Sequence, residues 1–195
     1  SHTLIIGAGL TGLMAAHRLT ERGQTVTVLE KGRSVGGRLA TRRVGGGHAD
    51  HGAQFFTVRD DSFNAYVQRW QADGLIYEWA RGWSDGTSPA KTDGFPRYAV
   101  KGGLNALAVH LKNSLPGDLA NVLVNVKVTA LSSEGGSWRI TDETGQIFTA
   151  DSLILTAPVP QSLALLDAGQ TVLSEPDRAA LSAVRYHSCL CGLIF

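Results

Sequence analysis

A glycine-spaced turn near the N-terminus constrains the fold more than any other feature. In "GAGLTG" the glycines occupy positions 7, 9 and 12, directly after the aliphatic run Thr3–Ile6, which is typical of a buried strand. Behind the turn, Leu10–Arg22 carries apolar side chains at helical spacing. The next run, "TVTVLE" at Thr25–Glu30, is again typical of a buried strand. A strand, a helix and a parallel strand within about thirty residues predict a βαβ unit.

The same spacing suits the binding of a dinucleotide. The first glycine permits the tight turn, the second lets the backbone approach a pyrophosphate, and the third lets the helix pack against the strand. Phosphates then sit at the helix N-terminus, where free N–H groups and the helix dipole favour negative charge. Glu30 ends the second strand, eighteen residues after Gly12, and a carboxylate there binds ribose hydroxyls and disfavours a 2′-phosphate. A glycine-rich turn without a ligand remains the alternative.

A second glycine pair, Gly36-Gly37, follows the second strand and is itself followed by Arg38. Two glycines let the chain fold back over phosphates without a side-chain clash. The planar guanidinium of an arginine suits phosphate oxygens. A solvated basic loop is the alternative, but it would not predict the Gly-Gly-Arg order. We therefore interpret the loop as a second clamp on one dinucleotide, a clamp that nicotinamide dehydrogenases do not generally carry.

Five segments, taken in order, resemble the FAD-dependent amine oxidoreductases, and within them the renalase-like branch most closely. They are "LIIGAGLTGLMAA", "VLEKGRSVGGRLAT", "DHGAQFFT", "VKGGLNALA" and "ADSLILTAPVPQSLALL". The resemblance covers nearly the whole chain. It departs from ordinary amine oxidases at Ser34, where those enzymes usually carry an arginine, and this position also varies in the renalase-like branch.

The resemblance implies an FAD-dependent oxidase that takes a hydride from a small-molecule substrate and passes the electrons to dioxygen, which yields hydrogen peroxide. For the renalase-like branch it implies misreduced dihydronicotinamide isomers as the substrate. A flavin amine oxidase and a catalytically silent dinucleotide-binding module are the alternatives. Hydride transfer to a flavin depends more on orientation than on a strong acid or base, so no catalytic residue is predicted.

The motifs and the resemblance together give a set of cofactor-binding candidates. The segment His51–Phe56 is expected to lie against the flavin, Lys101–Gly103 to form another close backbone approach, and the backbone of Val126 to contact the adenine. The full set is Gly7, Gly9, Leu10, Thr11, Gly12, Glu30, Lys31, Gly37, Arg38, Gly52, Ala53, Gln54, Phe55 and Val126.

The expected fold class is α/β: a doubly wound FAD-binding, Rossmann-like domain with a second substrate domain that contains an antiparallel sheet. We assign residues 1–57 and 101–158 to the first domain, and 58–100 and 159–195 to the start of the second. The apolar run Cys189–Phe195 is expected to be a buried strand. Because it ends the chain without a polar tail, we expect the sequence to be an N-terminal fragment whose C-terminal remainder is missing.

Outside the motifs, the pattern predicts an irregular loop over Lys31–Ala49, a helix over Asp60–Gly74 and a strand over Leu75–Trp83. A polar turn region is expected over Ser84–Phe95. The remaining predicted elements are a helix through Leu111, one strand over residues 121–133, a hairpin turn over Glu143–Gln146 and an apolar strand over Ser152–Thr156.

The composition argues against several partner classes. The formal net charge is +1, which gives no reason to propose a nucleic acid or an anionic membrane as partner.

Cys189 and Cys191 lie too close along one strand to pair easily, so they are expected to be core thiols of a cytoplasmic protein. The oligomeric state is left open.

Two groups of side chains allow more than one interpretation. His48, Asp50 and His51 have nearly the spacing of metal ligands, but flavin chemistry needs no metal and none is predicted. Four aromatic residues could line a substrate pocket or form part of the core, and the core is favoured because aromatic residues dominate cores. They are Trp70, Trp79, Trp83 and Phe95.

Overall fold

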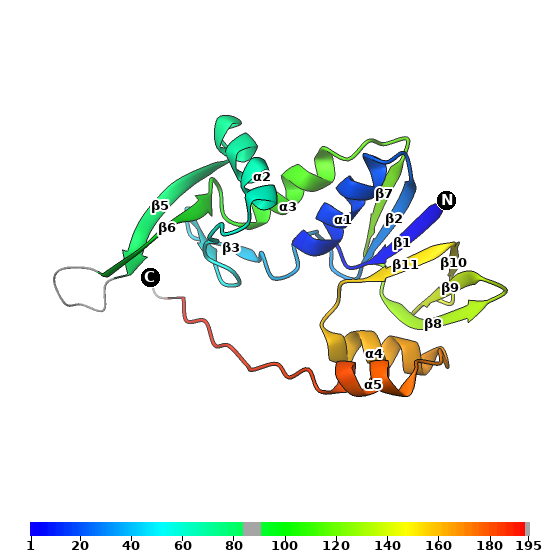
Figure 1. Cartoon of the computed structure of the whole chain (residues 1–195). Helices are drawn as coiled ribbons and strands as arrows, with labels where there is room; N and C mark the ends of the chain where they lie inside the picture. The colour runs from blue at the N-terminus through cyan, green and yellow to red at the C-terminus, as the bar shows by residue number, and fades with distance from the viewer. Residues whose placement is uncertain (84–90, 194–195) are drawn as a thin grey trace. The chain divides into compact units, whose positions relative to one another are not determined.

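The computed structural model describes residues 1–83 and 91–193 of the chain (Figure 1). It divides into two compact units. The first unit comprises residues 1–37 and 110–190, and the second comprises residues 38–109 together with 191–195.

A four-stranded parallel sheet forms the centre of the first unit. The predicted βαβ unit is confirmed: β1 and β2 pair in parallel with Ile5 opposite Val28, and α1 connects them. Two strands from later in the chain extend the sheet, one on each side, so the order is β11-β1-β2-β7. The elements are β1 (His2–Ile6), α1 (Leu10–Thr20), β2 (Thr25–Glu30), β7 (Ala120–Val124) and β11 (Ser152–Leu155).

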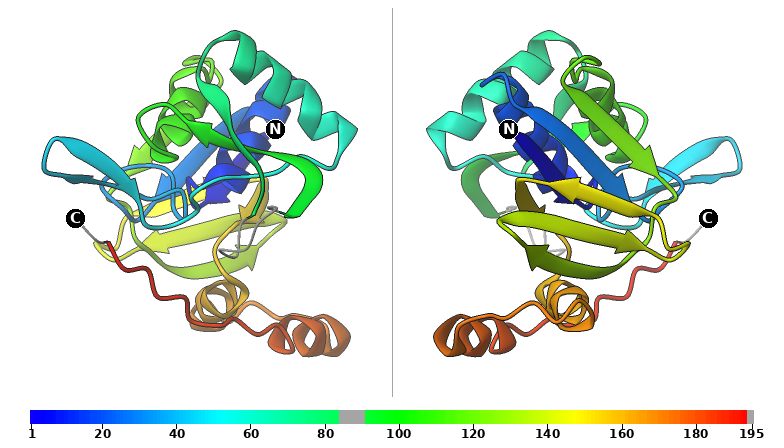
Figure 2. Two further views of the ribbon diagram at one scale, coloured as in Figure 1. Left: turned by 90° about the vertical axis from the view of Figure 1, so that its left-hand side faces the viewer. Right: turned by 90° about the vertical axis from the view of Figure 1, so that its right-hand side faces the viewer.

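The two faces of this sheet are covered by different elements, as both views in Figure 2 show. Helix α1 packs on one face, with Leu13 and Ala16 fully buried. On the other face lies a three-stranded antiparallel sheet made of β8 (Val128–Glu134), β9 (Ser137–Asp142) and β10 (Ile147–Ala150). Between the two sheets, Leu4, Ile6 and Leu29 form one core with side chains that include Leu131 and Ile140.

These layers agree with the predicted α/β fold class. A fully buried aliphatic side chain contributes about 1.5–3 kcal/mol relative to an exposed one, so the alternating apolar residues of β1 and β2 hold both layers against the sheet. The core thereby fixes the carboxyl end of β1, from which the glycine-spaced turn starts.

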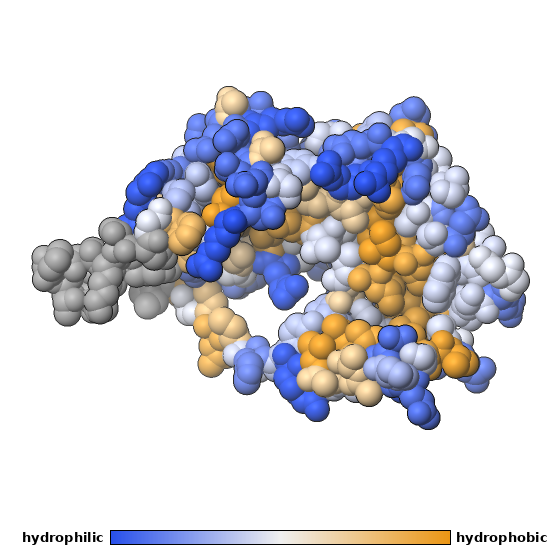
Figure 3. Space-filling view, in the orientation of Figure 1, coloured by the Kyte–Doolittle hydropathy of each residue, from blue (hydrophilic) through white to orange (hydrophobic). Residues whose placement is uncertain are grey.

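Two helices complete the first unit. Helix α4 (Val159–Ala168) packs on β8, and α5 (Glu175–Ser182) packs on α4. The side chain of Ser174 caps α5 by accepting a hydrogen bond from the Asp177 N–H. Figure 3 shows hydrophobic side chains gathered over these helices, where a groove is lined by Leu155, Ala157, Val159, Ser162, Leu163, Leu166 and Leu181.

The second unit is built around an antiparallel ribbon and a helix. Strands β5 (Ile76–Trp83) and β6 (Lys91–Val100) pair, and α2 (Asp61–Ala72) packs against β5. The Asp60 carboxylate caps α2 by accepting a hydrogen bond from the Phe63 N–H at 3.0 Å. Helix α3 (Asn105–Asn113) begins in this unit. The helix predicted over Asp60–Gly74 and the strand predicted over Leu75–Trp83 are thus confirmed to within two residues.

Two predicted connections are wrong. The loop expected over Lys31–Ala49 contains a hairpin of β3 (Thr41–Val44) and β4 (Gly47–Asp50), because Gly45 at φ +55° supplies the left-handed turn between them. Of the polar turn expected over Ser84–Phe95, residues 91–95 belong to β6, and residues 84–90 lie outside the described residues.

Two predicted strands also differ from the structure. The single strand expected over residues 121–133 is two strands, β7 and β8, because Asn125 at φ +57° breaks the run where the chain leaves one sheet for another. The C-terminal run is not a strand in its described part. Residues 185–193 have no regular structure, and Leu190 is 97% exposed. By contrast, the hairpin turn over Glu143–Gln146 is confirmed between β9 and β10.

The compact units divide the chain at other points than the predicted domains do. Residues 38–57 group with the α2 ribbon, and residues 159–190 group with the parallel sheet. The predicted assignment of residues from 159 onward to a substrate domain stays a prediction.

Candidate functional site

Gly7 and Gly12, the outer glycines of the turn after β1, are required by the packing of the chain itself. Gly7 has φ +104°, and a Cβ on it would lie 2.5 Å from Thr156 Oγ1. A Cβ on Gly12 would lie 2.0 Å from the Gly7 carbonyl oxygen. The Thr156 hydroxyl donates to the Ile6 carbonyl at 2.8 Å. No larger residue fits at either glycine without a shift of the backbone.

The middle glycine, Gly9, has open space instead. The nearest atom to a Cβ on Gly9 would be the Gly36 carbonyl oxygen at 3.9 Å. Gly36 pairs with Gly9 in a parallel bridge, and its N–H donates to the Ala8 carbonyl at 2.8 Å. Gly37, at φ +54°, lies against the same turn. The packing of the chain itself does not require a glycine at position 9. A glycine there is consistent with a backbone that a ligand approaches closely.

The N-terminus of α1 presents unsatisfied donors beside this open space. Gly9 is the N-cap and offers no side chain, and no acidic residue lies in the first turn. The Leu13 N–H makes the first backbone bond, to the Gly9 carbonyl at 3.0 Å. In the part of the chain that the structure describes, the N–H groups of Leu10 and Thr11 have no hydrogen-bond acceptor. Such donors, together with the positive end of the helix dipole, form a site for phosphate.

Glu30 lies at the end of β2, next to the turn, and is buried. Its Oε2 accepts a hydrogen bond from the Ala8 N–H at 2.9 Å, and its Oε1 accepts one from the Gly32 N–H at 2.7 Å. A carboxylate oxygen has two lone pairs, so each oxygen keeps one acceptor position for a ribose hydroxyl. The backbone of the turn therefore fixes the orientation of the carboxylate. Lys31, the next candidate, is exposed.

Val126 lies in the connection between β7 and β8 rather than in a strand. Its N–H already donates to the Glu30 carbonyl at 2.9 Å. Only the Val126 carbonyl is then left to accept a hydrogen bond from an adenine amino group. The position is next to Glu30, as a site for the adenosine end of a dinucleotide requires.

In the second unit, the structure brings Arg38 together with Gly52 and Ala53. A Cβ on Gly52 would lie 2.1 Å from the Arg38 carbonyl oxygen, and the Ala53 N–H donates to that oxygen at 2.9 Å. Gly52 is therefore needed by the packing of these two segments. The side chains of Arg38 and Gln54 are exposed, and Phe55 is half-buried. That these residues contact a cofactor stays a prediction.

Gly103, which the sequence predicts to approach the cofactor, packs against the β3–β4 hairpin. A Cβ on Gly103 would lie 2.3 Å from the Thr41 side chain. Asp50 accepts hydrogen bonds from the Thr41 hydroxyl and from the Leu104 N–H, the latter at 2.9 Å. The Asn105 N–H donates to the Thr41 hydroxyl oxygen at 3.0 Å. The hairpin thus caps the start of α3, and this explains the glycine.

The same contacts give Asp50 a structural role. Its neighbours in the histidine-rich segment, His48 and His51, are exposed. Among residues 1–83 and 91–193, no group of three or more His, Cys, Asp or Glu side chains could hold a metal ion.

Sequence reasoning missed two residues of this site. Ala8 donates to Glu30, and Thr156 locks the turn after β1. Gly36, which pairs with Gly9, belongs to the glycine pair that the sequence indicated. Ala8 acts through its backbone N–H, and Thr156 acts through a contact with Gly7, 149 residues away in the sequence. No local sequence pattern indicates either contact.

Two family models match parts of the chain. Residues 5–70 match the model of an NAD(P)-binding Rossmann-like domain, and residues 83–191 match that of the flavin containing amine oxidoreductases. The chain belongs to the flavin containing amine oxidoreductase family. Members of this family are flavin-dependent oxidoreductases, so the predicted enzyme class and the predicted cofactor, FAD, are confirmed at the level of the family.

Among the relatives, renalase from Mus musculus is 28% identical over 203 residues, which cover 96% of this chain and 56% of the mouse protein. The chain therefore spans about half the length of this relative. A CLA-producing fatty acid isomerase from P. acnes shares the fold, with a TM-score of 0.70 at 16% identity over 92% of this chain and 63% of the other.

A putrescine oxidase variant gives a TM-score of 0.71 at 14% identity over 93% of this chain and 62% of the other. These two structures support the fold alone. In the described residues, no helix is long and apolar enough to cross a membrane.

Proposed function

We propose that the chain is the FAD-binding part of an oxidase that takes a hydride from a small dihydropyridine substrate and gives the electrons to dioxygen. The bare backbone at Gly9, beside the unsatisfied N–H groups of α1 and the oriented carboxylate of Glu30, carries the cofactor part of this proposal. Similarity to renalase over 96% of the chain supports the substrate part.

Each candidate residue has a role in holding the dinucleotide. The N–H groups of Leu10 and Thr11 would donate to the pyrophosphate, and Glu30 would accept from the ribose hydroxyls. The Val126 carbonyl would accept from the adenine amino group. Arg38, which directly follows the glycine pair, would neutralise a phosphate with its planar guanidinium.

The remaining candidates concern the redox end. Gly52 and Ala53 give a backbone with little side-chain bulk, and Gln54 offers a neutral donor and acceptor for the edge of a flavin ring. When bound, FAD supplies a two-electron acceptor, and the overall reaction is dihydronicotinamide isomer plus dioxygen plus a proton to nicotinamide cation plus hydrogen peroxide. The chain's part is to orient the substrate and to exclude water.

A flavin amine oxidase is the second candidate, because the family model that matches residues 83–191 is named for amines. A catalytically silent dinucleotide-binding module is the third. We also propose, from the sequence alone, that the protein acts in the cytoplasm.

One set of assays separates these functions. The purified protein is first scanned for flavin absorbance and then supplied with 2- and 6-dihydro isomers of NAD, or with putrescine and a monoamine, while peroxide is measured. Peroxide from the dihydronicotinamide isomers alone supports the proposal. Peroxide from amines alone would replace it with the second candidate, and a flavin protein without turnover on any substrate would favour the third.

A further inference from the structure

The adjacent residues Phe55 and Phe56 face different surroundings. The Phe56 N–H donates to the Tyr98 carbonyl at 3.1 Å, and the Tyr98 N–H donates back at 2.9 Å, so this segment runs beside β6 like a short strand. Successive side chains of a strand point to opposite faces. The ring of Phe56 packs with Phe63 and Trp70 at centroid distances of 5.9 and 6.4 Å. One face of the segment therefore belongs to the core, and Phe55 lies on the other.

A β-bulge turns Trp79 toward Phe55. Glu78 pairs with Tyr98, and Ala80 pairs with Arg97, so Trp79 is an extra residue in β5. The ring centroids of Phe55 and Trp79 lie 5.9 Å apart. Bulges often re-aim a side chain next to an active site. The Trp79 side chain is left 51% exposed, whereas Trp70 is 2% exposed, so the core gains little from it.

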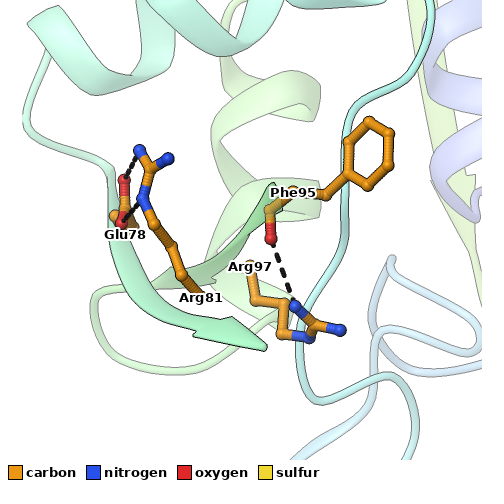
Figure 4. Close-up of polar contacts among 4 residues, drawn as sticks. All are labelled: Glu78, Arg81, Phe95 and Arg97. Carbon is orange, nitrogen blue, oxygen red and sulfur yellow. Dashed lines mark hydrogen bonds and ion pairs between the residues drawn. The ribbon is translucent and has the colours of Figure 1, made fainter. Parts of the chain in front are cut away.

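Two arginines stack on aromatic rings of this unit. The guanidinium of Arg97 lies 5.9 Å from the centre of the Phe55 ring, and its Nη1 donates to the Phe95 carbonyl at 3.1 Å (Figure 4). The guanidinium of Arg59 lies 5.0 Å from the centre of the Phe95 ring. Stacking on an aromatic ring holds a guanidinium plane in place for an anion. We call Phe55, Trp79, Phe95, Arg59 and Arg97 the aromatic–arginine face.

Two described acids near these rings, Glu78 and Asp60, are engaged elsewhere. Glu78 forms a bidentate ion pair with Arg81, with N–O distances of 2.6 and 2.8 Å (Figure 4). The hydrogen bond from Arg81 lowers the pKa of Glu78. Asp60 follows Arg59 in the chain, but its carboxylate caps α2. Arg97 is buried, so the accessible part of the face combines the rings of Trp79 and Phe95 with the exposed side chain of Arg59. A purely hydrocarbon partner would not need that charge.

We propose that the aromatic–arginine face recognises the substrate, with Trp79 and Arg59 as its specificity-determining residues. Trp79 and Phe55 stack on a planar pyridine ring, and Arg59 attracts the phosphate that the ring carries through its ribose. The inference rests on the proposed function, and it adds the prediction that the enzyme prefers phosphate-bearing dihydropyridines over the neutral riboside.

The test compares three variants of the FAD-loaded protein: Trp79→Leu, Arg59→Gln and the control Arg81→Gln, whose arginine is held by Glu78 on the same ribbon. Each is assayed with the dihydro isomers of nicotinamide mononucleotide and of nicotinamide riboside. We expect Arg59→Gln to raise KM at least about tenfold for the mononucleotide, the loss expected for one charge-assisted contact, and to leave KM for the riboside nearly unchanged.

Trp79→Leu is expected to raise KM about tenfold for both substrates, because stacking on the ring does not depend on the phosphate. Arg81→Gln should match the wild type with both. An unchanged flavin spectrum in all three variants would show that the cofactor site is intact. An equal effect of Arg59→Gln on both substrates, or an effect of Arg81→Gln as large as that of Arg59→Gln, would overturn the proposal.

A binding experiment keeps this inference separate from the proposed function. Calorimetry with oxidised nicotinamide mononucleotide measures recognition without turnover. If the wild type turns over no dihydronicotinamide but binds the mononucleotide about tenfold more tightly than Arg59→Gln does, the face stands and the proposed reaction fails. If the wild type does not bind the mononucleotide, or binds it no better than the variant does, the face is not a recognition site.

Discussion

The glycine-spaced turn at residues 7–12 and the second unit each contain two or more residues of one type that have different roles. In the turn, atoms of the chain occupy the space that a side chain would need at Gly7 and Gly12, whereas the space at Gly9 is open. In the second unit, Trp70 is buried in the core, and Trp79 is exposed on a bulge. The two regions differ in what decides these roles. In the turn it is the local backbone path, but in the second unit it is the packing of α2 and the register of β5 against β6.

This difference explains why the turn was predictable and the ribbon was not. A glycine spacing between a strand and a helix specifies its own geometry over a few residues. The sequence spacing of Trp70 and Trp79 specifies nothing about their surroundings, because the bulge that exposes Trp79 depends on the register of β5 against β6. The predictions below test the division into packed and open positions.

The largest effect is expected from alanine in the turn. Gly12→Ala places a methyl group 2.0 Å from the Gly7 carbonyl oxygen and should destabilise the fold by about 3 kcal/mol, the upper end of the usual cost of overpacking. Gly9→Ala should keep the stability of the apoprotein within about 1 kcal/mol of the wild type but lose bound FAD. Denaturant unfolding and the flavin content of both variants check this. Equal stability of the two variants would mean that the packing of the chain does not distinguish position 12 from position 9.

The two tryptophans give the next largest contrast. Trp70→Ala removes a buried ring that packs against Phe56, Phe63 and Tyr66 and should cost about 3–5 kcal/mol of unfolding free energy. Trp79→Ala should cost less than about 1 kcal/mol, as is usual for exposed positions. Thermal and denaturant unfolding of the two variants measures this. A loss for Trp79→Ala comparable to that for Trp70→Ala would show that Trp79 is part of the core.

A smaller contrast is expected among the arginines after the glycine pair. Arg38→Ala should weaken FAD binding about ten- to a hundredfold, because a charge-assisted contact contributes about 1.5–3 kcal/mol. Arg42→Ala and Arg43→Ala alter exposed side chains of the β3–β4 hairpin and should change the affinity little. Titration of each apoprotein with FAD checks this. If all three variants lose affinity equally, the loop is a diffuse basic surface.

The smallest effect concerns the turn between β9 and β10, a local motif that needs no ligand. Hydrogen bonds from the Thr144 hydroxyl and from backbone N–H groups hold the pKa of Asp142 below its ordinary value of 3.8. Because folding lowers the pKa of Asp142, its carboxylate stabilises the folded state at any pH above the ordinary pKa. This stabilisation is lost as the pH falls through the pKa of the folded state. Wild type should therefore be more stable than Asp142→Asn at neutral pH. Unfolding of both proteins from neutral pH to below pH 3.8 measures the gap. A gap that widens as the pH falls would contradict the assignment.

The sequence predicted most of what is encoded over short distances. The βαβ unit, the position of Glu30, the helix at Asp61–Ala72 and the β9–β10 turn all follow from local patterns. The break at Asn125 was missed because it depends on the sheet that the segment meets. The hairpin β3–β4 was missed because its glycine turn at Gly45 was interpreted as part of an irregular loop. Within the candidate site, the glycines and Glu30 were found, whereas Thr156 was not, since its contact joins opposite ends of the first unit's sequence.

The central claim is that the open position at Gly9, the donors of α1 and the carboxylate of Glu30 hold FAD. The most direct measurement is to denature the purified protein, separate the released small molecules by chromatography and identify them by absorbance and mass. The account predicts FAD, non-covalently bound and at about one molecule per chain, since the site has a single glycine-spaced turn. Release of NAD or FMN in place of FAD would contradict it.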